Sequence, residues 1–554
     1  MNEFRYLALL GLCSVFAQGQ PHMESGAQSA ANPGAGASLS ASQANNVVRA
    51  AAYPGADCGT KINAADSAFR GTPVTIQFDQ ACGTSAWSNV RLSSGHSLEC
   101  AQAGTYNIGT IVLRGSNVVD LKGFSCKLQA ESAALPEIFR ILGASQSSNV
   151  AFFWIEGGFL YANGDTASGN AAIHIANASN IHIRGTVIDG GWDRDIVADN
   201  FGYLYLDQLR ANGAATDGIY LENTGAGPYF GGPAYLSHVQ VDSCACTDAA
   251  ISADNISSLE ITDSEVVGTS HGKGLLLTST NGANAPVPDY AGGIHVKGFT
   301  ADTTADVGIY VTNIIKSAFD GIWMSSGRAN SKYCMELGGT TSDISIINAH
   351  AFWCGNSALA IGGTASYIHV ANSSFSASPN EGIHVVSATH SSFIGNHCDS
   401  TGLNGAGVTE PYCIYEEPTS SNNEYVDNDA TGTTYGNHYG EAAPFVIEYN
   451  GNIDTPGAIR TQLPIISTGE QNISGCALSS AVGGAATGSF KAGATSCTVT
   501  ITPGIAAPNG FLCQAHDITT TANALVQTGS STTTCTLIGA VEPGDTIIWH
   551  ADAF

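Results

Sequence analysis

Three residues that could act in acid–base chemistry stand at the starts of successive short apolar segments. Asp217 precedes Ile219-Tyr220-Leu221, Asp248 precedes the next such segment, and His271 precedes Leu275. If these segments are stacked strands, carboxyl groups at equivalent positions lie about 5 Å apart, or about 10 Å when one strand is skipped. Carboxyl pairs at such separations hydrolyse glycosidic bonds. We therefore predict Asp217 and Asp248 as catalytic acids, with His271 tuning or orienting them.

A structural role is the alternative for the two aspartates. An Asp-Gly pair at the start of a strand is also a common turn, because Asp bonds its own backbone and Gly adopts positive φ. Both explanations of Asp217 and Asp248 stay open from the sequence.

A second cluster of polar and aromatic residues lies just upstream. Asp189, Asp193 and Asp195 could contact a substrate or bind calcium, since carboxylate oxygens are ligands that calcium prefers. A solvated acidic loop is the alternative. Trp192, Tyr203 and Tyr205 could stack against sugar rings, with packing within a loop as the alternative. Tyr220 could also contact substrate.

The elements that would position these residues recur down most of the chain. Short strands with alternating apolar residues begin at Ile309, Met335, Leu359, Ile383 and Ile414, in steps of 26, 24, 24 and 31 residues. The apolar period of two indicates strands, and a repeat of this length indicates a solenoid. A second strand often follows after a short polar corner. One strand pair per repeat without a helix predicts a parallel β-helix, whose strand face forms a groove suited to linear polymers.

The coils, the opening Tyr53–Cys58 and the short helix expected from Lys61 to Phe69 resemble the pectate-lyase-like superfamily of right-handed parallel β-helices. The resemblance covers about residues 53–430. It implies a protein directed at polysaccharides, because the superfamily includes polygalacturonase-type hydrolases, lyases, epimerases and phage tailspikes.

Within that superfamily the order of motifs is similar to the polygalacturonase pattern Asn-Thr-Asp, Asp-Asp, Gly-His-Gly, Arg-x-Lys. The resemblance implies that Asp217 is the first carboxylate, Asp248 one of the pair and His271 the histidine. It also implies that Lys297 binds substrate, with His295 where the family has arginine. This chain departs from the pattern at four positions: Ala215, Thr247, Ser270 and His295.

Composition and charge restrict the partners. The chain has 554 residues, a formal net charge of −27 and only 12% charged residues. A strongly acidic chain does not present the basic face that nucleic acids require. A neutral or cationic partner is easier to accommodate, and the many small residues suit tight corners.

The cysteines indicate disulfides in an exported protein. Removing Cys13 with a signal peptide leaves 14 of the 15 cysteines. We find no CxxC pair with zinc spacing and predict no metal site apart from the calcium option. Cys244-Ala-Cys246 is too short for an easy bridge to itself. The spacing predicts five local pairs: Cys58–Cys82, Cys100–Cys126, Cys334–Cys354, Cys398–Cys413 and Cys513–Cys535.

The chain divides into five expected parts. Residues 1–17 read as a signal peptide and 18–52 as a flexible leader. Residues 53–430 form the parallel β-helix with an N-terminal cap, interrupted by two long insertions at 190–216 and 281–290. Residues 431–469 are a linker. Residues 470–554 carry short strands typical of a small antiparallel β-sandwich, which could bind carbohydrate or assemble a homotrimer.

The sequence therefore predicts an all-β, secreted protein that acts on a polysaccharide without spanning a membrane. A glycoside hydrolase is the first hypothesis. A polysaccharide lyase or epimerase is the second. A non-catalytic glycan-binding surface protein or tailspike-like adhesin is the third.

Overall fold

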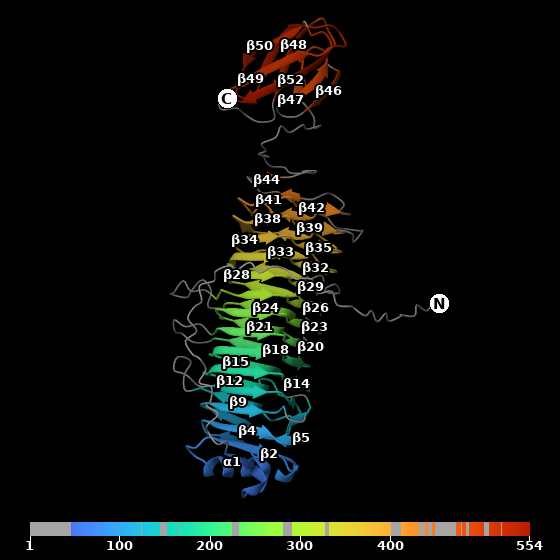
Figure 1. Ribbon diagram of the computed structural model, residues 1–554. Coiled ribbons are helices and arrows are strands. Elements are labelled where there is room, and N and C mark those ends of the chain that lie inside the picture. The colour runs from blue at the N-terminus through green and yellow to red at the C-terminus, as the bar shows by residue number, and fades with distance from the viewer. Residues whose placement is uncertain are drawn as a thin grey trace, which may run out of the picture. The chain divides into compact units, whose positions relative to one another are not determined.

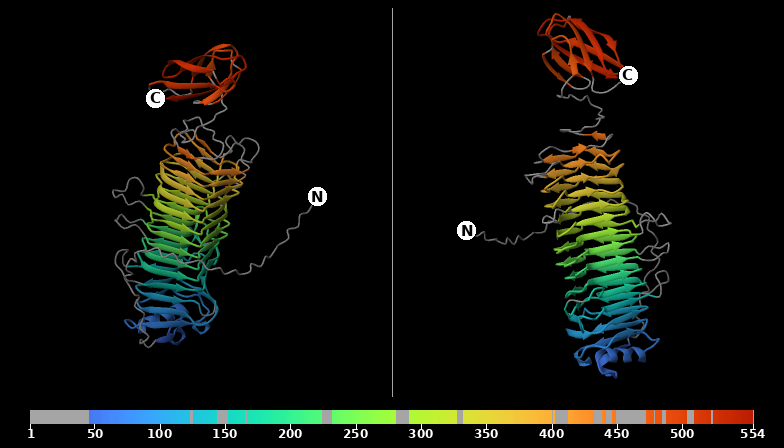
Figure 2. Two further views of the ribbon diagram at one scale, coloured as in Figure 1. Left: turned by 45° about the horizontal axis from the view of Figure 1, so that its top comes forward. Right: turned by 180° about the vertical axis from the view of Figure 1, so that it is seen from behind.

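The computed structural model describes residues 46–553 apart from 123–124, 144–151, 165–166, 224–231, 281–290, 327–331, 400, 402–411, 432–437, 441–445, 449–471, 478, 484–486, 503–508 and 522. The expected signal peptide and most of the expected leader lie outside the described residues. Strands stack in layers from β1 to β44 as a right-handed parallel β-helix (Figure 1). The other views show the same layering (Figure 2).

Three parallel sheets form the solenoid, which we call sheets A, B and C. Each coil runs from sheet B to sheet A and then to sheet C. Sheet A has 17 strands: β1 (Val47–Arg49), β2 (Val74–Phe78), β4 (His96–Cys100), β7 (Asn117–Asp120), β10 (Phe153–Glu156), β13 (Ser179–Arg184), β16 (Gly202–Asp207), β19 (Ala234–Ser237), β22 (Leu259–Thr262), β25 (His295–Lys297), β28 (Ile315–Asp320), β31 (Ser342–Ile347), β34 (Ala365–Ala371), β37 (Ala388–Thr389), β38 (Ser392–Ile394), β41 (Glu424–Val426) and β44 (Val446–Glu448).

Sheets B and C complete each coil. Sheet B has 14 strands: β3 (Val90–Leu92), β6 (Ile111–Arg114), β9 (Glu137–Leu142), β12 (Ala171–Ala176), β15 (Arg194–Asp199), β18 (Asp217–Glu222), β21 (Ala249–Asp254), β24 (Lys273–Thr278), β27 (Ile309–Thr312), β30 (Met335–Gly338), β33 (Leu359–Ile361), β36 (Ile383–Val385), β40 (Ile414–Glu416) and β43 (His438–Gly440). Sheet C has 13 strands: β5 (Gly104–Ile108), β8 (Cys126–Ala130), β11 (Phe159–Tyr161), β14 (Val187–Asp189), β17 (Arg210–Asn212), β20 (Gln240–Asp242), β23 (Glu265–Val267), β26 (Thr300–Thr304), β29 (Trp323–Ser326), β32 (His350–Phe352), β35 (Ser374–Ser376), β39 (His397–Asp399) and β42 (Asp429–Thr431).

Apolar side chains stack in register inside the solenoid. In sheet B, Ile196, Ile219 and Ile251 are partners on three successive strands, and all three are fully buried. Stacked aliphatic residues give each coil a dry interface with the next, so the core extends along the solenoid instead of growing as one sphere.

The corner between sheets A and C uses residues that tolerate positive φ. Every coil from β10 to β41 places one residue there with φ between +45° and +72°, for example Asn372 and Gly395. Gly adopts this conformation freely, and Asn and Asp are the side chains that tolerate it best. Asn177, Asn255 and Asn313 have positive φ after strands of sheet B.

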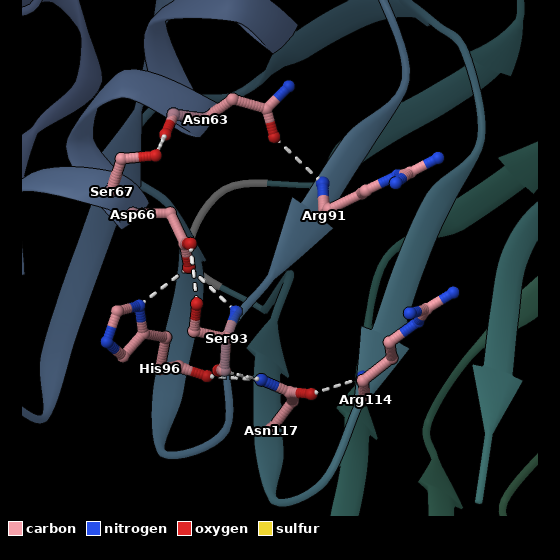
Figure 3. Close-up of polar contacts among 8 residues, drawn as sticks. All are labelled: Asn63, Asp66, Ser67, Arg91, Ser93, His96, Arg114 and Asn117. Atoms are coloured by element: carbon pink, nitrogen blue, oxygen red, sulfur yellow. Dashed lines mark hydrogen bonds and ion pairs between the residues drawn. The ribbon is translucent and has the colours of Figure 1, made fainter. Parts of the chain in front are cut away.

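The α-helix α1 (Cys58–Ala68) covers the first coil, together with the short 3-10 helices η1 (Ala50–Ala52) and η2 (Gln80–Cys82). Its N-cap Asp57 accepts a hydrogen bond from Thr60 N and is part of a capping box. Asn63 Oδ1 accepts the backbone N–H of Arg91 on β3 at 2.8 Å (Figure 3). Asp66 accepts Ser93 N at 2.8 Å, Ser93 Oγ at 2.7 Å and His96 Nδ1 at 2.6 Å. The helix thereby protects the edge of sheet B, which would otherwise expose unpaired amides.

The C-terminal unit is an antiparallel sheet of eight strands that encloses its own apolar core. The order is β45 (Asn472–Ser474), β48 (Ser496–Thr502), β51 (Cys535–Ala540), β50 (Ala524–Ser530), β49 (Phe511–Asp517), β52 (Thr546–Ala553), β47 (Thr487–Lys491) and β46 (Ser479–Gly483). The antiparallel all-β unit is as expected, with its strands joined in one continuous sheet. Homotrimer formation through it stays a prediction.

All five cysteine pairs predicted from the spacing are present. The structure adds a pair that the sequence did not suggest, Cys476–Cys497. It also pairs Cys244 with Cys246, contrary to expectation. Both of these side chains are buried while the residue between them is exposed, so strand alternation directs them to the same side of the chain.

Other expectations need correction. Residues 190–216 are not an insertion but an ordinary coil with β15, β16 and β17. Each coil has three strands, not two. The solenoid starts at β1, ahead of Tyr53, and strands β43 and β44 from the expected linker pair with β40 and β41. Among the described residues no helix is long and apolar enough to cross a membrane.

Candidate functional site

The outer face of sheet B brings together polar residues from successive coils. Arg194, Asp217, Ala249 and Lys273 are register partners on β15, β18, β21 and β24. They are the first residues of their strands, so they line one row along the sheet. The residues just before them form a second row at the corner from sheet C, which includes Asp248.

Arg194 holds Asp217 in this row. Its Nε lies 2.9 Å from Asp217 Oδ2, and its guanidinium lies 4.2 Å from the centre of the Tyr220 ring. The other oxygen of Asp217 accepts the backbone N–H of Ala249 at 3.3 Å. Tyr220 projects outward from β18 and forms a hydrogen bond with Glu222.

Asp217 is fully buried, and burial raises its pKa to about 6. The Arg194 guanidinium opposes this shift, whereas the negative charge of Asp248 adds to it. A carboxyl group of this kind is partly protonated near pH 6. Asp217 and Asp248 thus have different environments: the first is buried, whereas the side chain of the second is 48% exposed.

Lys273 lies between two carboxylates. Its Nζ is 3.8 Å from Asp248 Oδ1 and 3.7 Å from Asp306 Oδ2. These two distances limit the separation of the two oxygens to at most 7.5 Å, which allows the spacing of about 5–5.5 Å that retaining glycosidases use. Lys332 Nζ contacts the other oxygen of Asp306 at 3.4 Å. The carboxyl groups of Asp248 and Asp306 both reach solvent, with 48% and 23% of their side chains exposed.

Gly272 separates these carboxylates along the corner row. A Cβ added there would lie 2.5 Å from the carbonyl oxygen of Asp248, so no larger residue fits without a shift of the backbone. His271 precedes this glycine and is exposed. The coils of β21 and β24 thus approach closely at Gly272, next to His271 and Lys273.

A second charged cluster lies on the same face, two strands away from Asp217. His174 on β12 contacts Glu137 with Nδ1 at 3.2 Å and Asp199 with Nε2 at 2.9 Å. Arg140 adds a contact to Glu137 at 3.3 Å. Hydrogen bonds to Asp199 and then Glu137 raise the pKa of His174 to about 9, so it is a cation at neutral pH.

The structure places the predicted catalytic residues together. Asp217, Asp248 and His271 lie on or beside three successive strands of sheet B, and Tyr220 lies on the same face. The negative charge of Asp248 acts on the carboxyl group of Asp217, so these two side chains lie near each other.

Lys297 and His295 are not part of this group. Both are exposed on β25, which belongs to sheet A. The resemblance had implied a common groove. Lys297 and His295 are separated from the site because their strand follows the corner between sheets B and A and therefore lies on another face of the solenoid.

The predicted substrate contacts upstream also need correction. Trp192 is fully buried and packs in the solenoid core. Asp193 is buried, accepting Thr216 Oγ1 at 2.6 Å and Gly169 N at 2.6 Å. Asp195 on β15 faces the interior of the solenoid, and Asp189 lies on sheet C. Asp193 and Asp195 are withdrawn from solvent, because the stretch is a coil in which inward and outward residues alternate. In the described part of the chain, no group of three or more His, Cys, Asp or Glu is placed to hold a metal ion.

Three residues of the site were missed from the sequence: Lys273, Asp306 and Lys332. A signal for Asp306 exists, because Asp306-Val-Gly-Ile309 repeats the acidic residue and glycine before a strand that mark Asp217. The lysines carry no such signal, since only the stacking of coils brings them to the carboxylates.

Comparison with solved structures supports the fold. Tailspike protein 3 of bacteriophage CBA120 matches with a TM-score of 0.50 and 13% identity over 76% of this chain, which spans 62% of the tailspike. A GH87 alpha-1,3-glucanase catalytic domain in complex with tetrasaccharides matches with a TM-score of 0.47 and 13% identity, covering 69% of each chain. The Dettilon tailspike protein matches with a TM-score of 0.39 and 12% identity, covering 91% of this chain and 94% of the tailspike. No protein-family model and no curated protein matches the sequence.

Proposed function

We propose that this protein is a polysaccharide-degrading glycoside hydrolase that binds its polymer along the outer face of sheet B. The observation that carries the proposal is the group formed by Asp248, Lys273 and Asp306, in which two solvent-accessible carboxylates flank one ammonium. Glycosidic hydrolysis needs two such carboxyl groups on opposite sides of the scissile bond.

In this proposal Asp248 and Asp306 contact the reacting sugar. Asp217 is shielded from solvent and has a positioning role beside Asp248: Arg194 holds it, and burial and then the negative charge of Asp248 raise its pKa. His271 is exposed beside Asp248 and is the alternative proton donor. Tyr220 presents its ring edge and hydroxyl on the same face.

A lyase or epimerase is a weaker candidate. Those reactions need a base to remove a carbon-bound proton. Arg194, Lys273 and Lys332, the cations among these carboxylates, are all engaged in ion pairs with them, which argues against any of the three acting as that base. Calcium binding stays a prediction.

We also propose that the protein is secreted. The seven cysteine pairs fit an oxidising compartment, because disulfides persist there and are rare in the cytosol. The expected signal peptide at 1–17 would provide the route.

The test is a screen of the purified protein against a panel of polysaccharides. We expect new reducing ends without ultraviolet absorbance from unsaturated sugars. Asp248→Asn and Asp306→Asn should each lower the rate by about 10²-fold or more, since positioned acid–base groups contribute at least that much. Asp217→Asn should change the pH dependence around pH 6, where its carboxyl group titrates.

The matched control is Asp302→Asn, which removes an acidic residue of the neighbouring strand β26 in sheet C. It should retain full activity. Unsaturated products would indicate a lyase instead. Binding without any cleavage would indicate an adhesin, and unchanged rates in the Asp248 and Asp306 variants would place the chemistry elsewhere.

A further inference from the structure

From β9 to β40, the cationic side chains on the outer face of sheet B are paired with carboxylates. Arg140 contacts Glu137 at 3.3 Å, and Arg194 contacts Asp217 at 2.9 Å. Lys273 and Lys332 share Asp306. In the described part of the face between these strands and in its corner row, no Lys or Arg is left for a ligand. Arg91 and Arg114, which are exposed on β3 and β6, lie outside this stretch.

Carboxylates on this face outnumber the cations. From β9 to β40, ten carboxylates face four Lys or Arg side chains and two histidines that contact carboxylates, His174 and His384. Counting both histidines as cations still leaves an excess of four negative charges. The ten are Glu137, Asp199, Asp217, Glu222, Asp248, Asp254, Asp306, Glu336, Glu381 and Glu417.

Two of the carboxylates without an ion pair are neighbours. Glu222 and Asp254 are register partners on β18 and β21, so their backbones are about 5 Å apart. Glu222 bonds Tyr220, and Asp254 accepts hydrogen bonds from Thr280 N and Oγ1 at 3.0 Å. Neither contact supplies a positive charge.

Burial affects the titration of two carboxylates on this face. Burial raises the pKa of Asp254 and of Glu336. For Glu336 the charge of Asp306 acts in the same direction, although Lys332 and Lys273 oppose it.

The segments that join sheet B to its neighbours do not add a basic patch by composition. Among the residues outside the described ranges between β9 and β40 there is one cation, Arg328. The acids there are Asp165, Asp289 and Glu410.

We propose that the face of sheet B selects an uncharged glycan and excludes polyuronates and sulfated polymers. This inference rests on the proposed function and specifies its substrate class. A uronate chain would bring a carboxylate onto a surface that is already negative and that, in its described part from β9 to β40, has no unpaired Lys or Arg to bind it. In the polygalacturonase pattern an arginine and a lysine follow the histidine, but here His295 stands in place of the arginine and Lys297 lies on sheet A.

The test uses matched polymer pairs that differ only in charge. We would measure binding and cleavage of homogalacturonan against its fully methyl-esterified form, and of carboxymethyl cellulose against hydroxyethyl cellulose, at 20 and 200 mM salt. The uncharged member should be preferred, and any binding of the charged member should strengthen at the higher salt concentration because repulsion is screened.

Two variants test the origin of the preference. Glu222→Gln with Asp254→Asn removes two charges from the face without touching Asp248 or Asp306. Affinity for the charged probe should rise about two- to tenfold at low salt, and the gain should disappear at high salt. The control Glu260→Gln with Glu424→Gln removes two exposed charges from sheet A and should have no such effect.

The inference is overturned if a charged member binds more tightly than its uncharged partner and loses affinity as salt rises. It is also overturned if both double variants change affinity equally. Binding of uncharged polymers without cleavage would contradict the proposed hydrolase activity but would still support the charge selectivity.

Discussion

At the scale of single residues, the direction of a side chain decides what a carboxylate can do. Arg194 and Asp195 are adjacent on β15, yet the first faces the site and the second faces the core. Neither oxygen of Asp195 has a hydrogen-bond partner. Burial, followed by the charge of Asp189, raises its pKa well above the usual range. This residue weakens the coil directly behind the candidate site.

Replacing Asp195 should therefore stabilise the protein. Its register neighbours inside the solenoid are small residues such as Ala172, so Asp195→Ala fits the row. In the folded protein Asp195 keeps a proton that it releases in the unfolded chain. Stability therefore falls as pH rises above the pKa that Asp195 has in the unfolded chain. We expect Asp195→Ala to gain about 1–3 kcal/mol in urea unfolding at pH 8 and less at pH 4. A loss of stability at pH 8 would show that an internal partner satisfies the carboxyl group.

At the scale of elements, the cap helix and the last coils carry the polar groups on which stability depends. Asp66 of α1 accepts three hydrogen bonds from Ser93 and His96, both of the first coil (Figure 3). Removing it leaves buried donors without acceptors. We expect Asp66→Ala to lower the free energy of unfolding by about 2–4 kcal/mol and to promote aggregation through the exposed edge of sheet B.

The control lies on the same helix. Ser67 is exposed, and its hydroxyl bonds only the carbonyl of Asn63 within α1. Ser67→Ala should leave thermal unfolding nearly unchanged. Equal effects of the two substitutions would mean that the contacts of Asp66 do not fasten the cap.

Glu416 on β40 makes the last coils sensitive to pH. It is fully buried, its Oε1 accepts Asn423 Nδ2 at 2.6 Å, and burial raises its pKa to about 7. The folded state keeps the proton that the unfolded chain loses near pH 4.5. Stability of these coils should therefore fall as pH rises from 4.5 to 7, by at most about 3 kcal/mol, and stay lower above pH 7.

Glu416→Gln should remove that dependence. We would follow hydrogen exchange of β40 and β41 at pH 5 and pH 8, where the wild type should lose protection at the higher pH and the variant should not. Glu424→Gln, at an exposed position of β41, is the control and should behave like the wild type. Identical pH dependence in Glu416→Gln and the wild type would contradict the assignment.

At the scale of the whole molecule, disulfides link coils whose stability is local. Cys100 and Cys126 join successive coils and are 26 positions apart in sequence. Each coil contacts only its neighbours, so a lost link should affect nearby coils alone. We expect Cys100→Ala with Cys126→Ala to destabilise the first coils by about 3 kcal/mol, visible as faster hydrogen exchange from β2 to β9.

The matched control removes Cys513–Cys535 from the C-terminal sheet and should leave the solenoid unchanged. A uniform loss of protection from β9 to β40 in the first variant would show that the solenoid unfolds as one cooperative unit.

Much of the architecture could be predicted from the sequence. The strands that begin at Ile309, Met335 and Leu359 can be recognised in the sequence, because every second residue faces the core and must be apolar. The strands of sheet C were missed because most have three residues with one buried side chain, as in β14 and β17. A single apolar residue between two polar ones gives no periodic signal.

The amino-acid sequence by itself determined the stacked coils, five of the cysteine pairs and the candidate acids Asp217 and Asp248, because local alternation and spacing encode them. Only the tertiary structure decided which sheet each polar residue occupies. A shift of one residue moves a side chain from solvent to the core, and a corner moves it to another face. That is why Trp192 and Asp195 turned inward, Lys297 fell on sheet A, and Lys273 and Asp306 met Asp248 across separate coils.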